Sequence, residues 1–543
     1  MKTSRSVVVS ALLTLTTAMA CSVVVGEDPV QCSTDADCAR RGPDFEGSVC
    51  GANGTCQPAP APPPECTKSS ECAGRGPDQI CSPRLQKCMA ATSEDCTVAY
   101  GNPSEDGAVI FGLLSEIGHG DTLYFRQSQH LLGAQLAFRE FFDRNAVRLP
   151  GNRPAALLSC SEYRPRRAAA HLANVGVRAV IGPAEESRQR AVLETLAEAG
   201  VPSFTSWMNG NPSGVVAESA GLAWITSFLR PEVVDPLNAV VAEQEARIKA
   251  TGVTNVRVAV VINTPTTASY NPWREYGDLM DQRLRFNGKT AIENEKDPGC
   301  GNCYKRFETS QALPDVVAAR AKAIADFGPH IVIPFADIDW GAQLLLAIEN
   351  EYQGKPPAVA RPVYVQAFTQ NEDQGYKALS YGDPAVRQRI TGVRPVRDNS
   401  FELFQNKFRE SFRPKSFPDR LGPVPNRGAG GAFETSLLVL FAAYAAMVDD
   451  PSIEPKDLIA ALQVVADPTA PKITLNDIPV GIQRLNAKER IKLNGLFTFF
   501  DFDFASSTAK PTWATWCLSE AGQYVSSARI FSNGTFGPAE PCP

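Results

Sequence analysis

The sequence has no long run of basic residues and only four histidines among its 543 residues. Its 53 lysines and arginines are outnumbered by 59 acidic residues, so it lacks the basic stripe that tracks a nucleic acid backbone. The motifs G-x-S-x-G, H-E-x-x-H and G-x-x-x-x-G-K are absent, and the histidines are scattered along the chain. We therefore expect no nucleic acid partner, no enzyme activity, and no metal or cofactor.

The composition also excludes several classes of chain. Hydrophobic residues make up 43% and charged residues 21%, which does not fit a mostly disordered, collagen-like or multi-spanning membrane protein. A late apolar stretch, 437–448, has only 12 residues, too few to span a bilayer. It is predicted to be a buried helix.

The N-terminus has the features of an export signal. Lys2 and Arg5 give a positive start, 7–15 is mostly apolar, and Ala18-Met19-Ala20 precedes Cys21. We interpret residues 1–20 as a signal peptide. A cysteine at the new N-terminus resembles a bacterial lipobox, although Ala18 stands where leucine is usual.

The cysteine count favours a lipid anchor on Cys21. There are 15 cysteines, and setting Cys21 aside leaves 14, which can close completely into seven disulfides in an oxidising compartment. The protein is thus predicted to be exported and anchored to a membrane. The alternative is a secreted, soluble protein in which Cys21 is free.

Two short cysteine-rich units follow, at 32–56 and 66–88. Each holds four cysteines, and a C-A-x-R-G-P-D segment recurs in both. Units of about 25 residues cannot bury a sufficient core, so disulfides must hold them. They resemble Dickkopf-like cysteine-rich repeats of bacterial surface proteins. We expect 21–95 to be a stalk. The alternatives are that the repeats bind a protein or glycan, or that Asp35 and Asp37 belong to a calcium-binding loop.

From Cys96 onward, apolar strands alternate with amphipathic helices. Examples are 109–114 followed by a helix within 131–147, and 331–335 followed by one at 340–350. This order is typical of a parallel sheet with helices on both faces, and it predicts an α/β fold for 96–543.

Five motifs in this region carry a family resemblance: Gly133-Ala134-Gln135-Leu136-Ala137, 177–183 (VRAVIGP), 198–204 (EAGVPSF), Tyr276-Gly277 and 433–446. In this order they resemble the type I periplasmic solute-binding proteins, specifically the branched-chain amino acid binding group of ABC importers.

The resemblance implies two Rossmann-like lobes joined by three crossovers, which we place near Trp224, Gly392 and Phe504. The expected lobe boundaries are 97–223 with 392–503 for lobe one, and 224–391 with 504–543 for lobe two.

The resemblance also implies where a ligand binds. In lobe one it assigns contacts to Ser187, Ser206, Trp207 and Asn209. In lobe two it points to loops that contain the following residues: Tyr276, Asp337, Asp339, Gln366 and Thr369. Packing inside the protein is an alternative role for Trp207, and exposure on a loop for the two aspartates.

The implied ligand is a small, amino-acid-like solute. The segment 366–369, where amino-acid binders usually carry an acid for the ligand ammonium, has no carboxylate. The implied partner is an ABC importer permease, and the alternative function is a surface or sensory receptor without transport.

The remaining cysteines are expected to form structural disulfides. Cys300 and Cys303 lack the sequence context of haem attachment, structural zinc or thioredoxin chemistry, so a loop-pinning disulfide is favoured over a redox or metal role. The other expected pairs are Cys96–Cys160 and Cys517–Cys542.

Overall fold

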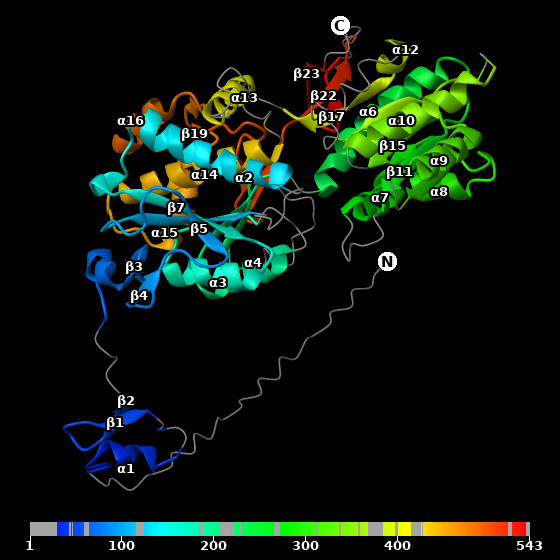
Figure 1. Ribbon diagram of the computed structural model, residues 1–543. Helices are drawn as coiled ribbons and strands as arrows, with labels where there is room; N and C mark the ends of the chain where they lie inside the picture. Colours follow the sequence, from blue (N-terminus) through cyan, green and yellow to red (C-terminus); the bar gives the residue numbers. More distant parts are fainter. Residues whose placement is uncertain are drawn as a thin grey trace, which may run out of the picture. The chain divides into compact units, whose positions relative to one another are not determined.

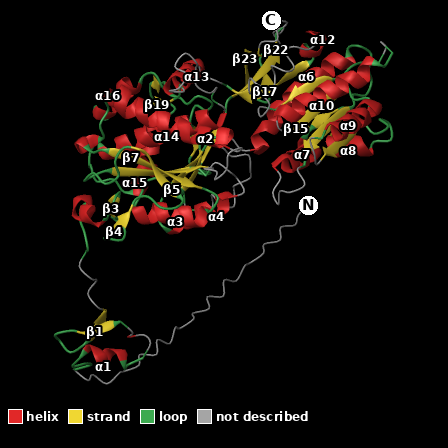
Figure 2. Cartoon of the chain, viewed as in Figure 1, coloured by secondary structure: helices red, strands yellow, loops and turns green. Residues whose placement is uncertain are grey.

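The computed structural model shows two compact units, one ending at Pro64 and one beginning at Glu65 (Figures 1 and 2). The residues described are 30–42, 45, 47–58, 64–115, 124–183, 188–206, 219, 221–227, 230–264, 272–309, 313–335, 338–356, 359–367, 384–396, 400–413, 425, 427–519 and 524–538.

The two cysteine-rich repeats have the same architecture. The first contains helix α1 (Asp35–Ala39) and strands β1 (Ser48–Cys50) and β2 (Cys56–Pro58); the second contains the 3-10 helix η2 (Ser69–Arg75) and strands β3 (Gln79–Cys81) and β4 (Cys88–Ala90). In both, the first cysteine pairs with the third and the second with the fourth: Cys32–Cys50 and Cys38–Cys56, then Cys66–Cys81 and Cys72–Cys88. The predicted duplication is confirmed.

Asp35 and Asp37 have structural roles in the first repeat. The Asp37 carboxylate accepts the backbone N–H groups of Ser33 and Thr34, at 2.9 and 2.8 Å, before α1. Asp35 accepts the N–H of Cys50 at 2.8 Å. Asp37 therefore satisfies backbone donors at the start of α1, as a capping residue does, while Asp35 ties the helix to β1.

The second repeat packs against lobe one. Ile80 and Ala91 are fully buried in the same core cluster as Leu172 of helix α3 (Pro165–Val175). The Ser82 hydroxyl donates to the Asn174 carbonyl at 2.5 Å, just before the end of α3. This differs from the expected stalk of two repeats, because the second repeat covers apolar surface of the lobe.

Lobe one is built on an eight-stranded sheet with the order β20-β21-β10-β9-β8-β6-β7-β5. Its six central strands, β21 to β7, are parallel, while β5 and β20 join as antiparallel edges. The strands are β5 (Cys96–Tyr100), β6 (Val109–Ser115), β7 (Ala155–Ser161), β8 (Val180–Ile181), β9 (Ser203–Thr205), β10 (Ala223–Ile225), β20 (Asp501–Asp503) and β21 (Thr508–Lys510).

Both faces of this sheet are covered. The strand β6 is buried throughout, with Phe111 in one core cluster and Ile110 in the other. The remaining lobe-one elements are α2 (Tyr124–Phe138), the π-helical turn η3 (Arg139–Arg144), η4 (Pro150–Asn152), α4 (Gln189–Glu198), α13 (Ser400–Ser411), α14 (Arg427–Met447), α15 (Pro455–Val465), β18 (Lys472–Ile473), α16 (Ile478–Asn486) and β19 (Lys492–Leu493).

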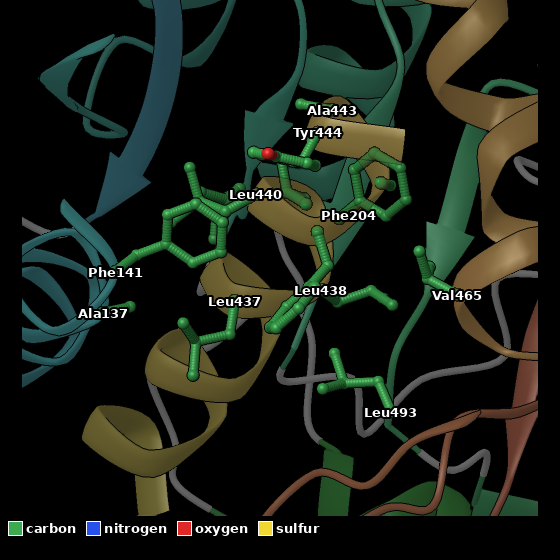
Figure 3. Close-up of a cluster of buried hydrophobic side chains, with 14 of the residues drawn as sticks. Ala137, Phe141, Phe204, Leu437, Leu438, Leu440, Ala443, Tyr444, Val465 and Leu493 are labelled. Carbon is green, nitrogen blue, oxygen red and sulfur yellow. The ribbon is translucent and has the colours of Figure 1, made fainter. Parts of the chain in front are cut away.

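Helix α14 is the central helix of lobe one. Figure 3 shows its residues Leu437, Leu438 and Leu440 among side chains from several elements, including Phe141 and Phe204. By length and composition α14 could span a membrane, but 89% of its most apolar window is buried inside the protein. The predicted buried helix is confirmed, and it is longer than the apolar run.

Lobe two is built on a second eight-stranded sheet, in the order β14-β11-β15-β16-β17-β22-β23-β24 (Figure 1). The strands are β11 (Val258–Asn263), β14 (Tyr304–Thr309), β15 (Ile331–Phe335), β16 (Val363–Gln366), β17 (Ile390–Pro395), β22 (Trp513–Leu518), β23 (Tyr524–Ser532) and β24 (Thr535–Phe536). The covering elements are η6 (Arg230–Val233), α6 (Val234–Lys249), α7 (Pro272–Arg283), β12 (Arg285–Phe286), β13 (Lys289–Thr290), α8 (Ala291–Lys296), α9 (Pro314–Phe327), α10 (Ile338–Gln353) and α12 (Pro384–Arg387).

The chain crosses between the sheets later than expected each time. Trp224 lies in β10 of lobe one, Gly392 lies in β17 of lobe two, and Phe504 lies in the β20–β21 hairpin of lobe one. The crossovers follow Ile225, Pro395 and Lys510 instead, because each strand completes its pairing before the chain leaves the sheet.

The structure confirms two predicted disulfides, Cys96–Cys160 and Cys300–Cys303. Cys96 and Cys160 face each other on the antiparallel strands β5 and β7. Cys517 is also disulfide-bonded, while Cys542 lies outside the described residues.

Candidate ligand-binding site

The strand order of each sheet marks one edge as a candidate place for a ligand. In lobe one, β7 lies on one side of β6 and β8 on the other; in lobe two, β14 and β15 flank β11 in the same way. Connections from such central strands leave in opposite directions, which opens a crevice outside their carboxyl ends. Ser115 and Asn263 end β6 and β11 and are both buried.

In lobe one, His130 and Ser206 form a buried polar pair. His130 lies on α2, which follows β6, and Ser206 follows β9. His130 Nε2 lies 3.3 Å from Ser206 Oγ, and the two residues are 4% and 5% exposed. Among the described residues, His130 Nδ1 has no hydrogen-bond partner.

Two glycines allow helices to approach this pair closely. A Cβ at Gly431 of α14 would lie 3.3 Å from Ser206 Cβ, so α14 passes directly beside Ser206. A Cβ at Gly133 of α2 would overlap the Ala429 carbonyl oxygen of α14. Because Gly133 and Gly431 have no side chains, α2 and α14 can pack closely together beside Ser206.

Burial lowers the pKa of His130 to about 4. The imidazole is therefore uncharged at neutral pH, and its two nitrogens provide one donor and one acceptor. Because Nε2 faces Ser206, the nitrogen of His130 that can still form a hydrogen bond is Nδ1.

This pKa predicts a pH-dependent stability. Between about pH 6.5 and 4 the unfolded state binds a proton at His130 that the folded state does not, so stability falls as pH falls through this window. The contribution is roughly 3 kcal/mol over the whole window. Urea unfolding at several pH values should show a shallower pH dependence in His130→Gln than in the wild type. Equal slopes would contradict the prediction.

Other hydroxyls at this edge of lobe one fix the strand ends. Ser203 Oγ donates to the Gly182 carbonyl at 2.6 Å, which ties β9 to the end of β8. Thr226 Oγ1 lies 2.7 Å from Thr435 Oγ1 and links the end of β10 to α14. These groups have protein partners, so they position the site.

In lobe two, three buried polar groups lie at or just after strand ends. Thr309 is the last residue of β14 and Gln366 the last of β16, while Trp340 lies in the first turn of α10, which follows β15. They are 4%, 2% and 2% exposed, respectively. Within the described part of the chain, Thr309 Oγ1, Gln366 Oε1 and Trp340 Nε1 have no hydrogen-bond partner.

Tyr276 supports this edge from inside the lobe. Its ring stacks on that of Phe335, the last residue of β15, with centroids 4.9 Å apart and planes 9° apart. Both side chains are fully buried. The aromatic pair therefore fixes the β15 end by packing, and the ligand contact expected for Tyr276 stays a prediction.

Of the residues predicted to bind a ligand, Ser206 and Gln366 lie at the carboxyl ends of strands and Tyr276 lies beneath one. Sequence reasoning missed His130, Thr309 and Trp340 as ligand contacts. Thr309 ends a strand that carries three charged residues, whereas Trp340 follows the apolar strand 331–335, after which such a residue can be sought. The predicted ligand-binding residues outside the described side chains are Ser187, Trp207, Asn209, Asp337 and Thr369, together with the alternative acid Asp339.

Comparison with known proteins identifies the fold through structure alone. No protein-family model matches the chain, and no curated protein matches its sequence.

Solved structures do match. The branched-chain amino acid transporter substrate-binding protein LivJ from Streptococcus pneumoniae, in complex with isoleucine, is 13% identical, with a TM-score of 0.51 over 78% of this chain and 99% of that one. A periplasmic binding protein type 1 from Bordetella pertussis is 10% identical, with a TM-score of 0.50 over 77% of this chain and 99% of that one. The predicted fold, two lobes of the periplasmic binding protein type, is confirmed.

Proposed function

We propose that this protein binds a small solute outside the cytoplasm, through residues at the carboxyl ends of the sheets in both lobes. One observation carries the proposal: polar groups are buried there with hydrogen-bonding atoms that no described residue satisfies. An unmatched buried polar atom costs roughly 1–3 kcal/mol, so such atoms at a crevice edge favour a role in recognition. A bound ligand would then favour a closed arrangement of the lobes.

A ligand screen tests the proposed function. Thermal unfolding of the full-length protein should shift upward with at least one small solute, because a ligand that binds only the folded state stabilises it. At a concentration about 100 times the dissociation constant, the stabilisation is about 2.7 kcal/mol. The first set consists of amino acids, which the family resemblance implies. No stabilisation by any of a broad set of solutes at millimolar concentration would argue against solute binding.

The finer role proposed is that of the substrate-binding component of an ABC importer. It is supported by the likeness of the fold to a transporter substrate-binding protein. A surface or sensory receptor is the alternative, supported by the first cysteine-rich repeat, which belongs to a separate compact unit as an interaction module would. Reconstitution with a permease encoded beside this protein would distinguish the two roles, because ligand-dependent ATP hydrolysis is expected only for an importer.

Anchoring through Cys21 is a further part of the proposal. All cysteines among the described residues are disulfide-bonded, which fits an exported protein in an oxidising compartment. Mass spectrometry of the mature protein should find acyl chains on Cys21, and Cys21→Ala should move the protein from the membrane to the soluble fraction. Several acyl chains hold a protein much more firmly than a single myristoyl group. An unmodified, soluble mature N-terminus would refute the anchor.

A further inference from the structure

The buried polar atoms that have no hydrogen-bond partner indicate which class of ligand would bind. Five buried residues at this edge of the two sheets each have a polar atom without a hydrogen-bond partner among the described residues. All lie at the end of a parallel strand or in a helix that follows one, and each is at most 4% exposed. They are His130, Gln189, Thr309, Trp340 and Gln366.

None of the five side chains carries a charge at neutral pH. Gln189, the first residue of α4, leaves an amide N–H donor unmatched, and Trp340 leaves an indole N–H. Gln366 leaves an amide oxygen acceptor, while the Thr309 hydroxyl and the neutral His130 imidazole each offer a donor or an acceptor. These groups match a ligand that itself contains both donors and acceptors.

The charged side chains described at the same edge have partners within the protein. Arg188 lies over the Tyr163 ring, 4.3 Å from its centroid, and its Nη1 is 3.9 Å from a Glu162 carboxylate oxygen. Arg394 of β17 is buried and also engaged within the protein. These charges are therefore already in contact with other groups of the protein.

Among the described residues, charge and burial together favour an uncharged ligand. A formal charge that leaves water for a buried site is strongly disfavoured unless an opposite charge meets it. Hydroxyl and amide groups need only hydrogen bonds, which the five residues can supply. A free amino acid would bring both an ammonium and a carboxylate to these neutral groups.

We infer that the ligand is an uncharged molecule rich in hydroxyl or amide groups, such as a sugar, a sugar alcohol or a carboxamide. This inference rests on the proposed function and specifies the ligand class of the same site. Gln366 is its central element, because the whole residue is 2% exposed, it ends β16, and its amide oxygen has no hydrogen-bond partner among the described residues.

The test compares two sets of probes on the full-length protein by thermal shift, followed by isothermal titration calorimetry. The uncharged set contains glucose, ribose, mannitol and nicotinamide; the charged set contains leucine, glutamate, benzoate and putrescine. Stabilisation by at least one uncharged probe, with none from the charged set, is the expected result. Stabilisation by charged probes alone would overturn the inference and leave solute binding intact. No stabilisation by either set would count against the proposed function and so against the inference.

A pair of variants then tests the role of Gln366 with the best uncharged probe. Gln366→Leu removes the amide at nearly constant size and should weaken binding about tenfold, the loss of one hydrogen bond to a neutral group. The matched control is Gln353→Leu at the exposed end of α10, which should bind as the wild type does. Equal affinities in the wild type and Gln366→Leu, with both proteins folded by circular dichroism, would refute the role of Gln366.

Discussion

Replacing Ile80 by alanine is expected to lower the free energy of unfolding of the second compact unit by roughly 2–5 kcal/mol. Ile80 is 1% exposed, and its side chain belongs to the lobe-one core cluster that contains Leu172 and Val180. Truncation leaves a cavity in that cluster and removes apolar contacts across the boundary between the repeat and the lobe. Urea unfolding, followed by circular dichroism, measures the change.

The duplicated repeat supplies the control. Val49 precedes the third cysteine of the first repeat, as Ile80 does in the second, but Val49 is only partly buried and lies in the other compact unit. Val49→Ala should leave the unfolding of the second unit within about 0.5 kcal/mol of the wild type. Equal effects of the two substitutions would mean that the second repeat does not stabilise the lobe.

Glu349→Gln is expected to destabilise lobe two by about 3 kcal/mol. The Glu349 carboxylate is 5% exposed and binds both Nη atoms of Arg389, at 2.8 and 2.7 Å. It also accepts the Tyr364 hydroxyl at 2.7 Å and Arg361 Nη1 at 3.2 Å. Removing the negative charge leaves the partly buried Arg389 guanidinium without its counterion.

An exposed ion pair of the same lobe is the control for Glu349. Asp326 pairs with Lys322 one helical turn away on α9, at 3.1 Å, and both side chains are more than half exposed. Asp326→Asn should change stability by no more than about 0.5 kcal/mol, because water screens such pairs. Chemical unfolding followed through the tryptophan fluorescence of all three proteins would show the contrast. If Glu349→Gln lowered the stability no more than Asp326→Asn does, the buried network around Glu349 would contribute little to the stability of lobe two.

The sequence predicts the regular elements of the lobes well because their patterns are local. The run at 331–335 becomes β15, buried at every position, and the run at 437–448 falls almost wholly within α14. Apolar content and length decide such elements. The lobe boundaries depend instead on which sheet a strand joins: β21 pairs with β10, far back in the sequence, and β20 pairs with β21. No local pattern carries that information.

The site was less predictable for the same physical reason. Ser206 and Gln366 follow or end apolar strands, so the family motifs could place them. His130 lies inside a helix, three residues before Gly133, and acquires its role only when β9 places Ser206 beside it. The docking of the second repeat rests on Ile80, and the first repeat offers Val49 at the same position. Two similar apolar residues thus have different environments, which the sequence of the repeat does not specify.

The pairing of distant strands has a consequence for the order in which the chain can fold. Strand β10 needs β21 at its side, and β17 needs β22, so neither sheet is complete until residues 501–518 have been synthesised. Until then a growing chain leaves strand edges that can pair with other chains. Folding that begins after release from the ribosome or the export machinery would avoid this hazard. Shortened chains that end before β20 should accordingly aggregate even though they keep every predicted ligand-binding residue.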